Sequence, residues 1–379
     1  MKSFYEFFAG GGMVRIGLGS GWECVFANDN DSKKVAAYRR NFAPAIELLD
    51  TDIAIVRPDQ LVGRADLAWA SFPCQDLSLA GSGAGLGGSR SGTFWPFWRL
   101  IKELGKSRRA PSVVVLENVC GALTSHGGND FKTIASSLHR AKYRFGAVVI
   151  DAIHWLPQSR PRLFIIAAHR AVALPETTTA NEPAYWHPSS VERAYSRLPK
   201  SVRASWVWWS LPAPPNRVRD FADLIEEPPQ GVDWHTAAET KRLLAMMSPV
   251  NAEKVREAKR LSRATNRRLI GGLYKRMRGG IQRAEVRFDK VSGCLRTPVG
   301  GSSRQTILVV DGGKVKSRLL SPREAARLMG LPEEYVLPSS YNGAYHLAGD
   351  GVAVDVVRFL AQNLLDLILD ENNRQAVAA

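Results

Sequence analysis

Short apolar segments alternate with helical patterns through the first 170 residues, and this alternation most limits the folds open to the chain. Ser3 to Phe8, Trp22 to Asn28 and Ser112 to Glu117 each have the length of a strand. Residues 113–116 are continuously apolar, as in a strand that is covered on both faces. Three further strand-like segments complete the set: 65–71, 143–151 and 162–168. The pattern predicts an α/β fold with a doubly wound, mostly parallel, Rossmann-like sheet.

The pattern changes after residue 171, where proline, tryptophan and basic residues become dense and regular periodicity fades. We expect a first domain at 1–171 and a smaller, loop-rich module at 172–316. Residues 317–370 return to the first domain through a helix capped by Ser321 and a last amphipathic helix. Residues 371–379 form a tail that we expect to fray.

Charge points to a polyanionic partner. The chain has 51 Lys and Arg against 36 Asp and Glu, a formal net charge of +15. Between Lys254 and Arg304 there are 15 basic residues and 3 acidic ones. This excess of positive charge favours contacts with phosphates. The alternative is a solvated basic surface without any partner.

Cysteine usage indicates a reducing compartment. The four cysteines lie far apart, without a Cys-x-x-Cys pair or a nearby histidine cluster: Cys24, Cys74, Cys120 and Cys294. This spacing argues against a zinc site and against a disulfide framework. The first residues lack the features of a signal peptide, and no apolar run reaches membrane-spanning length. We expect a cytoplasmic protein without metal or membrane contact.

The sequence Phe72-Pro73-Cys74-Gln75 sets one of these thiols at the end of a strand-like segment. A Gly/Ser-rich stretch, residues 78–93, follows it. A cysteine in a turn at a strand end is a candidate nucleophile, because catalysis needs a presented thiolate. The alternative is a small buried hydrophobic residue.

A glycine-rich turn and two acids indicate a cofactor site. Phe8-Ala9-Gly10-Gly11-Gly12 follows a strand and opens a helix, so that a ligand can approach its backbone. Asp29 ends the second strand, where it can bind ribose hydroxyls, and Asp52 can accept a hydrogen bond from an adenine amine. Together they suggest a cofactor containing adenosine. Each acid could instead be a turn former or a helix cap.

Two further motifs end at the same edge of the expected sheet. Glu117 emerges from the apolar strand at its carboxyl end, where open α/β proteins bind ligands. If Cys74 adds to an electron-poor heterocycle, an acid beside the ring nitrogen can offset the negative charge that develops. Arg160 and Arg162, in Gln-Ser-Arg-Pro-Arg, could clamp a base carbonyl or a phosphate. All three could also be ordinary surface or strand-end residues.

Taken in order, these motifs resemble those of the cytosine-specific DNA methyltransferases that act on carbon 5. The resemblance covers most of the chain and rests on eight ordered segments: FFAGGGMVRIGL, FANDND, DTDI, SFPCQDLSLAG, LENV, QSRPRLFIIA, SRLLSPREAARLMGLP and GDGVAV. It implies transfer of a methyl group from S-adenosyl-L-methionine, and a catalytic, cofactor-binding domain at 1–171. It also implies that residues 172–316, in which Arg304 is a candidate base reader, form a target-recognition domain.

The resemblance also implies roles for single residues. Cys74 attacks carbon 6 of a cytosine and so activates carbon 5, Glu117 holds the ring nitrogen and amine, and Arg160 and Arg162 orient the base. The base has to be extruded from the duplex to be reached, and the loop after Cys74 closes over it. The implied cofactor contacts are Phe8, Ala9, Gly10, Gly12, Asp29, Asn30, Asp52, Ile53 and Pro73.

Three positions depart from the family pattern. Glu6 stands where the family commonly has Asp, Asp350 where it usually has Asn, and Gly351 where it usually has Ser or Ala. The implied partner is double-stranded DNA, bound by a monomer, with a separate cognate restriction endonuclease if the enzyme is not an orphan methylase. Two alternatives remain: a methyltransferase of transfer RNA, and a catalytically silent DNA-binding regulator.

Overall fold

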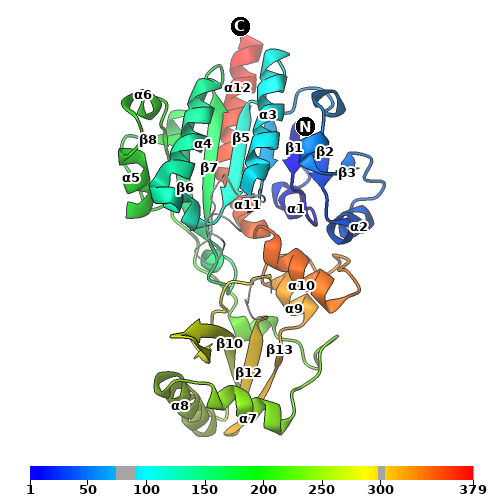
Figure 1. Ribbon diagram of the computed structural model, residues 1–379, viewed down its shortest axis with the longest axis vertical. Helices are drawn as coiled ribbons and strands as arrows, with labels where there is room; N and C mark the ends of the chain where they lie inside the picture. The colour runs from blue at the N-terminus through cyan, green and yellow to red at the C-terminus, as the bar shows by residue number, and fades with distance from the viewer. Residues whose placement is uncertain (74–90, 298–303, 379) are drawn as a thin grey trace. The chain divides into compact units, whose positions relative to one another are not determined.

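The computed structural model describes residues 1–73, 91–297 and 304–378. Cys74 and most of the Gly/Ser-rich stretch after it therefore lie outside the described residues. The chain divides into two compact units (Figure 1). The large unit is Met1–Asp151, Pro161–Pro214 and Val356–Ala379, and the small unit is Ala152–Arg160 and Pro215–Asp355.

The large unit is built on a sheet that has seven strands within the described ranges, in the order β3-β2-β1-β4-β5-β7-β6. The strands β1 to β5 run parallel, and β7 is antiparallel to both β5 and β6. The predicted α/β fold with a mostly parallel sheet is confirmed. The strand bounds are β1 Lys2–Phe7, β2 Trp22–Asp29, β3 Leu48–Asp50, β4 Leu67–Ala70, β5 Val113–Asn118, β6 Tyr143–Asp151 and β7 Pro161–His169.

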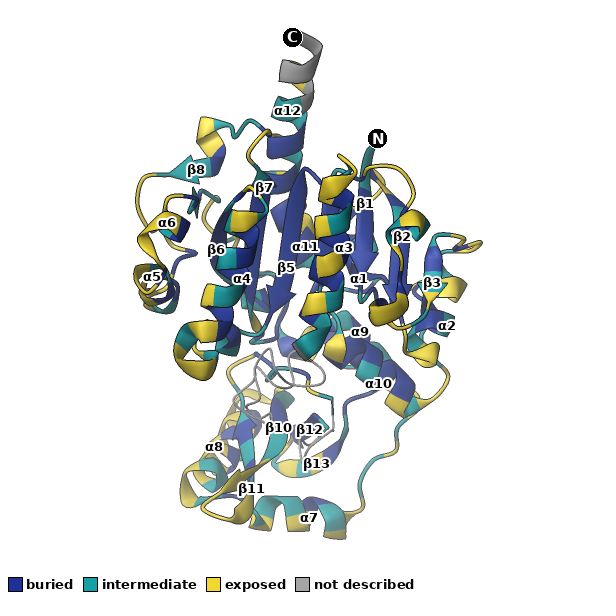
Figure 2. Cartoon of the chain, turned by 45° about the horizontal axis from the view of Figure 1, so that its top comes forward, coloured by how far each residue is buried: buried dark blue, intermediate teal, exposed yellow. Residues whose placement is uncertain are grey.

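Helices cover this sheet, and its strands are buried (Figure 2). Helices α3 and α4 lie on the same face of the sheet (Figure 1). The last helical segment buries Val356, Leu360, Leu364 and Ile368, as its amphipathic pattern predicts. The helices of this unit are α1 Met13–Leu18, α2 Ser32–Asn41, α3 Phe94–Lys106, α4 Asn129–Arg140, α5 Ser189–Ser196, α6 Lys200–Arg203, α11 Val354–Leu360, which begins in the small unit, and α12 Asp366–Ala378.

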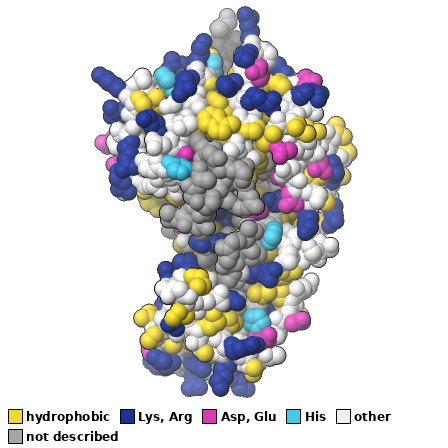
Figure 3. Space-filling view, viewed as in Figure 1, with side chains coloured by type: hydrophobic (Ala, Val, Ile, Leu, Met, Phe, Trp, Pro, Cys, Tyr) yellow, Lys and Arg dark blue, Asp and Glu magenta, His cyan; other side chains and the backbone are white. Residues whose placement is uncertain are grey.

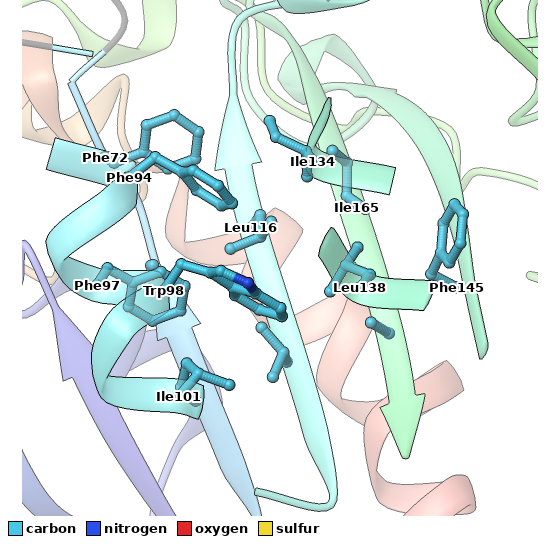
Figure 4. Close-up of a cluster of buried hydrophobic side chains, with 14 of the residues drawn as sticks. Phe72, Phe94, Phe97, Trp98, Ile101, Leu116, Ile134, Leu138, Phe145 and Ile165 are labelled. Atoms are coloured by element: carbon cyan, nitrogen blue, oxygen red, sulfur yellow. The ribbon is translucent and has the colours of Figure 1, made fainter. Parts of the chain in front are cut away.

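An aromatic core joins α3 to the end of β4. Figure 4 shows Phe72 beside Phe94, and their ring centroids are 5.7 Å apart. Phe94 stacks on Trp98 in the next turn of α3, and Leu116 of β5 belongs to the same buried cluster. A fully buried aromatic side chain stabilises the fold by about 1.5–3 kcal/mol. The chain is thus firmly anchored two residues before Cys74.

The small unit contains an antiparallel sheet with the strand order β11-β10-β12-β13. Its core packs Leu273, Ala284 and Leu308 against Val255 of helix α8. The sequence pattern predicts loops rather than this sheet, because basic residues interrupt the alternation of its strands. The bounds are β10 Leu269–Arg278, β11 Ile281–Arg287, β12 Thr306–Asp311, β13 Lys314–Leu319, α7 Ala237–Ala245, α8 Pro249–Thr265, α9 Pro322–Arg327 and α10 Tyr341–Asp350.

The predicted cap of α9 is confirmed. The Ser321 hydroxyl accepts a hydrogen bond from the Glu324 amide at 3.1 Å, and the Glu324 carboxylate accepts one from the Ser321 amide at 2.7 Å. Glu324 also forms an ion pair of 2.6 Å with Arg318, and both side chains are fully buried. The pair connects β13 to α9.

Residues 172–214 pack with the large unit. They include the short strands β8 Thr179–Ala180 and β9 Trp208–Trp209, which pair with each other, and an isolated bridge joins Trp206 to Phe145 of β6. Compactness alone does not say which residues touch a substrate, so the limits of a target-recognition region stay a prediction. No helix in the described part of the chain is long and apolar enough to cross a membrane.

Candidate active site

The glycine-rich turn connects β1 to α1 in a conformation that needs glycine. Gly10 and Gly12 have φ angles of 56° and 76°, and Phe8 also has a positive φ of 59°. A side chain at Gly12 would collide with the Phe42 ring, whereas one at Gly10 would meet no atom within 4 Å. Gly12 is therefore required by packing, while the space beside Gly10 stays open to a ligand.

Asp29 holds this turn from the end of β2. One carboxylate oxygen accepts a hydrogen bond of 2.8 Å from the Gly10 amide, and the other accepts one of 2.8 Å from the Asp31 amide. Burial raises the pKa of Asp29. Each carboxylate oxygen has two lone pairs, so both can still accept a hydrogen bond from a ligand hydroxyl.

Asn28 organises the neighbouring end of β3, a role that sequence reasoning missed. Its amide nitrogen donates to the carbonyls of Leu49 and Thr51 at 3.1 and 2.9 Å. Directly after, Asp52 caps a short helical turn by accepting from the Ala54 amide at 2.8 Å. The only sequence signal for Asn28 is its place before Asp29 at a strand end.

The predicted cofactor residues thus gather at the ends of three adjacent strands. Phe8 to Gly12 follow β1, Asp29 and Asn30 lie at the end of β2, and Asp52 and Ile53 follow β3. Asn30 and Asp52 are exposed, whereas Ile53 is buried. An adenosine-containing molecule fits these features: open space at Gly10, a hydrogen-bond acceptor at Asp29 and an exposed carboxylate at Asp52.

Glu6 lies buried beneath the turn, a position that sequence reasoning noted only as a departure. The backbone amides of Val14 and Arg15 at the start of α1 favour the charged form of this carboxyl group, although neither of its oxygens accepts a hydrogen bond of normal geometry. Burial raises the pKa of Glu6 to about 8. At neutral pH this carboxyl group is therefore mostly protonated.

Glu117 and Arg162 meet at the other group of strand ends. The Arg162 Nε atom lies 3.2 Å from a Glu117 oxygen, and the two side chains are 16% and 9% exposed. Glu117 stands near the end of β5 opposite Phe164 of β7, which places the ion pair at the carboxyl edge of the parallel strands. The guanidinium group offsets the cost of burying the carboxylate.

Asn118 ties the end of β5 to the segment that leads to Cys74. Its amide nitrogen donates to the Phe72 carbonyl at 3.2 Å, and its side-chain oxygen accepts from the Val119 amide at 2.9 Å. Pro73 is the last described residue before Cys74, which lies outside the described residues. Sequence reasoning gave Asn118 no role, although it stands beside Glu117 in the motif.

Arg160 lies in the small unit and differs from Arg162 in its contacts. One terminal nitrogen donates to the Leu295 carbonyl at 3.1 Å and to the Cys294 sulfur at 3.4 Å. The other donates to the Gly349 and Gly351 carbonyls at 2.8 and 2.7 Å. These bonds use all four terminal N–H groups of a guanidinium that is 2% exposed.

A hydrogen bond accommodates Asp350 at a position where the family usually has Asn. Its carboxylate accepts a hydrogen bond from the Thr297 hydroxyl. Gln158 connects the same part of the small unit, since it accepts from the Leu295 amide at 2.9 Å and donates to the Leu328 carbonyl at 2.7 Å. The segment around Arg160 thus fastens three stretches of the small unit together.

Two other thiols are poor nucleophiles. Burial raises the pKa of Cys24 to about 12, and burial also raises the pKa of Cys120. A thiol above its usual pKa is scarcely ionised at neutral pH. Within the described ranges, no three His, Cys, Asp or Glu side chains are grouped so that they could hold a metal ion.

Comparison with known proteins agrees with this geometry. Residues 2–366 match the family model of C-5 cytosine-specific DNA methylases. The chain is 26% identical to the Type II methyltransferase M.HhaI of Haemophilus parahaemolyticus, across 95% of this chain and 93% of that protein. It is 25% identical to the Type II methyltransferase M.HpaII of Haemophilus parainfluenzae, across 96% and 89%.

Solved structures share the fold. The Dnmt2 methyltransferase of S. pombe aligns with a TM-score of 0.60 and 15% identity, covering 98% of this chain and 99% of that one. The Entamoeba histolytica methyltransferase EhMeth aligns with a TM-score of 0.63 and 14% identity, covering 97% and 98%. The family match spans nearly the whole chain, both strand-end clusters included. The chain belongs to the C-5 cytosine-specific DNA methylases, enzymes that transfer a methyl group from S-adenosyl-L-methionine to DNA.

Proposed function

We propose that the enzyme methylates carbon 5 of a cytosine flipped out of double-stranded DNA, and that Cys74 adds to carbon 6 of that base. Addition of the thiolate makes carbon 5 nucleophilic. S-Adenosyl-L-methionine, when bound, supplies the electrophilic methyl group. Loss of the carbon 5 proton and departure of the Cys74 sulfur then release 5-methylcytosine. The base has to leave the stack because carbon 6 is inaccessible in a duplex.

The observation that carries this proposal is the Glu117–Arg162 ion pair at the carboxyl edge of β5, beside the bond from Asn118 to the Phe72 carbonyl. A carboxyl group held there can bind the ring nitrogen and amine of cytosine and offset the charge that develops on the ring. Arg162 fixes the orientation of Glu117, and Asn118 fixes the chain two residues before Cys74.

Cofactor binding falls to the other strand ends. Asp29 has acceptor capacity left for ribose hydroxyls, and a ligand can approach the backbone at Gly10, where no atom would meet a side chain. Phe8, Ala9 and Gly12 of the same turn are further proposed contacts. Asn30, Asp52, Ile53 and Pro73 complete the proposed contacts.

We assign Arg160 a different role from Arg162. Its terminal N–H groups are used by carbonyl and sulfur acceptors of the small unit. The contribution we infer is positioning: Arg160 holds the Cys294–Leu295 and Gly349–Gly351 segments, the second of which carries the last cofactor motif.

The substrate that fits the charge best is duplex DNA. The small unit carries the whole basic block between Lys254 and Arg304, and phosphate contacts supply the affinity that a basic module offers. We propose sequence-specific modification by a monomer in the cytoplasm, either beside a cognate restriction endonuclease or as an orphan methylase.

Tritium transfer from labelled S-adenosyl-L-methionine tests this function. We expect label in duplex DNA and none in transfer RNA. Label in transfer RNA alone would favour the RNA methyltransferase, and label in neither would leave a DNA-binding regulator. Cys74→Ser should reduce turnover below detection while cofactor binding persists, because a hydroxyl is not ionised at neutral pH. Substantial methylation by this variant would contradict the covalent mechanism.

A further inference from the structure

A two-stranded ribbon extends from the sheet of the small unit. In the described part of the chain, β10 pairs with β12 from Leu269 to Leu273 but with β11 as far as Arg278. The two strands are joined by Gly279 and Gly280, whose φ angles of 55° and 78° allow the tight turn. Residues 276–282 are all exposed. The ribbon is thus a projecting part of the fold.

The tip of the ribbon exposes apolar side chains that a folded protein normally covers. Met277 is 61% exposed and Ile281 is 55% exposed. On one face Met277 lies opposite Gln282, while on the other Arg278 lies opposite Ile281. The ribbon tip thus carries one large exposed apolar side chain on each face, where a partner that meets the ribbon can contact it.

The charges on the ribbon are unbalanced. Arg276 lies directly opposite Arg283, a cross-strand arrangement of like charges that destabilises an isolated ribbon. One acid, Glu285, serves both Arg278 at 2.7 Å and Arg276 at 3.6 Å. Arg276, Arg278 and Arg283 thus share one face of the ribbon with a single carboxylate, and Lys275 adds a fourth positive charge on the other face. A polyanion beside the ribbon would relieve this repulsion.

The other basic surface of the small unit includes α8, which carries five basic and two acidic residues. Lys and Arg side chains gather at the end of the small unit that carries α7 and α8 (Figure 3). On α8, however, Arg256 pairs with Glu253 and Arg260 pairs with Glu257, each one turn away. Lys259 belongs to the same basic surface. Each surface carries three more basic than acidic residues, so net charge does not separate them. The exposed Met277 and Ile281 at its tip favour the ribbon as the site of close DNA contact.

We propose that the β10–β11 ribbon enters the major groove of the target duplex, with Met277 and Gln282 against base edges and with Arg276, Arg278 and Arg283 against phosphates. The major groove admits a two-stranded ribbon. A glutamine amide can donate to and accept from a base edge, and an apolar side chain can contact a thymine methyl group. This proposal rests on the function proposed above and names the side chains that select the target.

The test uses the full-length enzyme and begins by mapping 5-methylcytosine in DNA from cells that express it. Equilibrium binding is then measured on a duplex with the mapped site and on one with that site scrambled, at several salt concentrations. Gln282→Ala should lower the discrimination between the two duplexes by roughly tenfold to a hundredfold. It should also relax the mapped site at one position.

Arg283→Ala should weaken binding to both duplexes alike and reduce the slope of log affinity against log salt by about 1. Lys241→Ala on α7, an exposed substitution outside the basic block, is the matched control and should change neither quantity. Lys259→Ala on α8 should reduce the slope less than Arg283→Ala does. Thermal unfolding of each variant checks that an exposed substitution leaves the fold intact.

Two results would overturn the inference. The first applies if the wild-type enzyme methylates DNA: both Gln282→Ala and Met277→Ala then methylate the same sequence as the wild type and keep its ratio of affinities for the two duplexes. The other is a salt slope that falls in Lys259→Ala but not in Arg283→Ala. A wild-type enzyme that methylates no DNA would instead reject the function proposed above, and the salt slope of Arg283→Ala would still report on the ribbon.

Discussion

The strand ends of the large unit and the β10–β11 ribbon of the small unit use polar residues in opposite ways. At the strand ends, Glu117 and Asp29 are buried and have defined partners in Arg162 and in backbone amides. On the ribbon, the side chains from Arg276 to Gln282 are exposed and their charges are unbalanced. We infer from this contrast that the groups proposed for chemistry are fixed before DNA arrives, whereas the groups proposed for recognition are completed by it.

The largest expected effect follows from breaking the buried pair. Glu117→Gln keeps the shape of the side chain but removes its charge and its ability to supply a proton. We expect kcat to fall by roughly a hundredfold to a thousandfold, because a preorganised group aimed at developing charge is lost. Single-turnover methylation of a duplex measures it, and Glu285→Gln on the ribbon serves as the control, with kcat unchanged. A loss of less than tenfold in Glu117→Gln would remove this residue from the chemistry.

The two arginines of the Gln-Ser-Arg-Pro-Arg motif should differ in their effect on activity. Arg160→Met removes four hydrogen bonds, two of them buried and two partly buried, so the free energy of unfolding should fall by about 3 kcal/mol. Arg162→Met should also lower stability, because it leaves the buried Glu117 carboxylate without its cation. Unlike Arg160→Met, it should in addition strongly lower kcat, since it removes the partner of Glu117. Denaturant unfolding and methylation assays on both variants check this. A kcat that falls no more in Arg162→Met than in Arg160→Met would contradict the roles assigned to them.

Because Glu6 is buried, we expect the free energy of unfolding to decline as the pH rises. Its pKa of about 8 in the folded protein lies above the ordinary value of 4.5, so the folded state holds a proton that the unfolded state has lost. Between about pH 5 and 8 the stability should therefore fall by up to about 1.4 kcal/mol per pH unit from this group. Glu6→Gln should flatten that part of the profile, as measured by denaturant unfolding at several pH values. Parallel profiles for the two proteins would show that Glu6 is ionised when folded.

Substitution of Asp29 tests the proposed cofactor site, and its expected effect is the smallest of the four. Asp29→Ala removes an acceptor and loosens the turn at Gly10, so the Kd for S-adenosyl-L-methionine should rise by roughly tenfold, about 1.4 kcal/mol. Asp31→Ala is the matched control, because Asp31 caps α2 by accepting from the Lys33 and Lys34 amides. It should cost about 1 kcal/mol of stability and leave the Kd unchanged. Isothermal titration distinguishes the two, and equal Kd values would place Asp29 outside the cofactor site.

The sequence predicts the large unit well because its signals are local. Strands of a buried parallel sheet are apolar throughout, as in residues 113–116, and glycines mark the turn after β1. The carboxyl ends of such strands converge, so the strand pattern alone assigns Glu117 and Asp29 to one edge of the sheet. The cap of α9 is equally predictable, because Ser321 and Glu324 have the spacing of a capping box.

Other features depend on contacts between distant residues. The sheet of the small unit was missed because β10 and β11 carry arginines where a strand pattern needs alternation, and their pairing is fixed only by register. The acceptors of Arg160 lie more than 130 residues along the chain, and Asn118 gains its role only when β4 and β5 lie side by side. Contacts between residues so far apart in the sequence leave no local pattern from which they could be predicted.

The central claim is that Phe72, Glu117 and Asn118, at the ends of β4 and β5, hold the chain so that Cys74 can reach carbon 6 of cytosine. A duplex with 5-fluorocytosine at the mapped target tests it most directly, since fluorine at carbon 5 cannot leave as a proton does and the addition product is held. We predict that, with S-adenosyl-L-methionine present, peptide mass analysis finds the nucleotide on Cys74 alone. A nucleotide on Cys24, Cys120 or Cys294, or no adduct from an enzyme that methylates the unmodified duplex, would contradict the account.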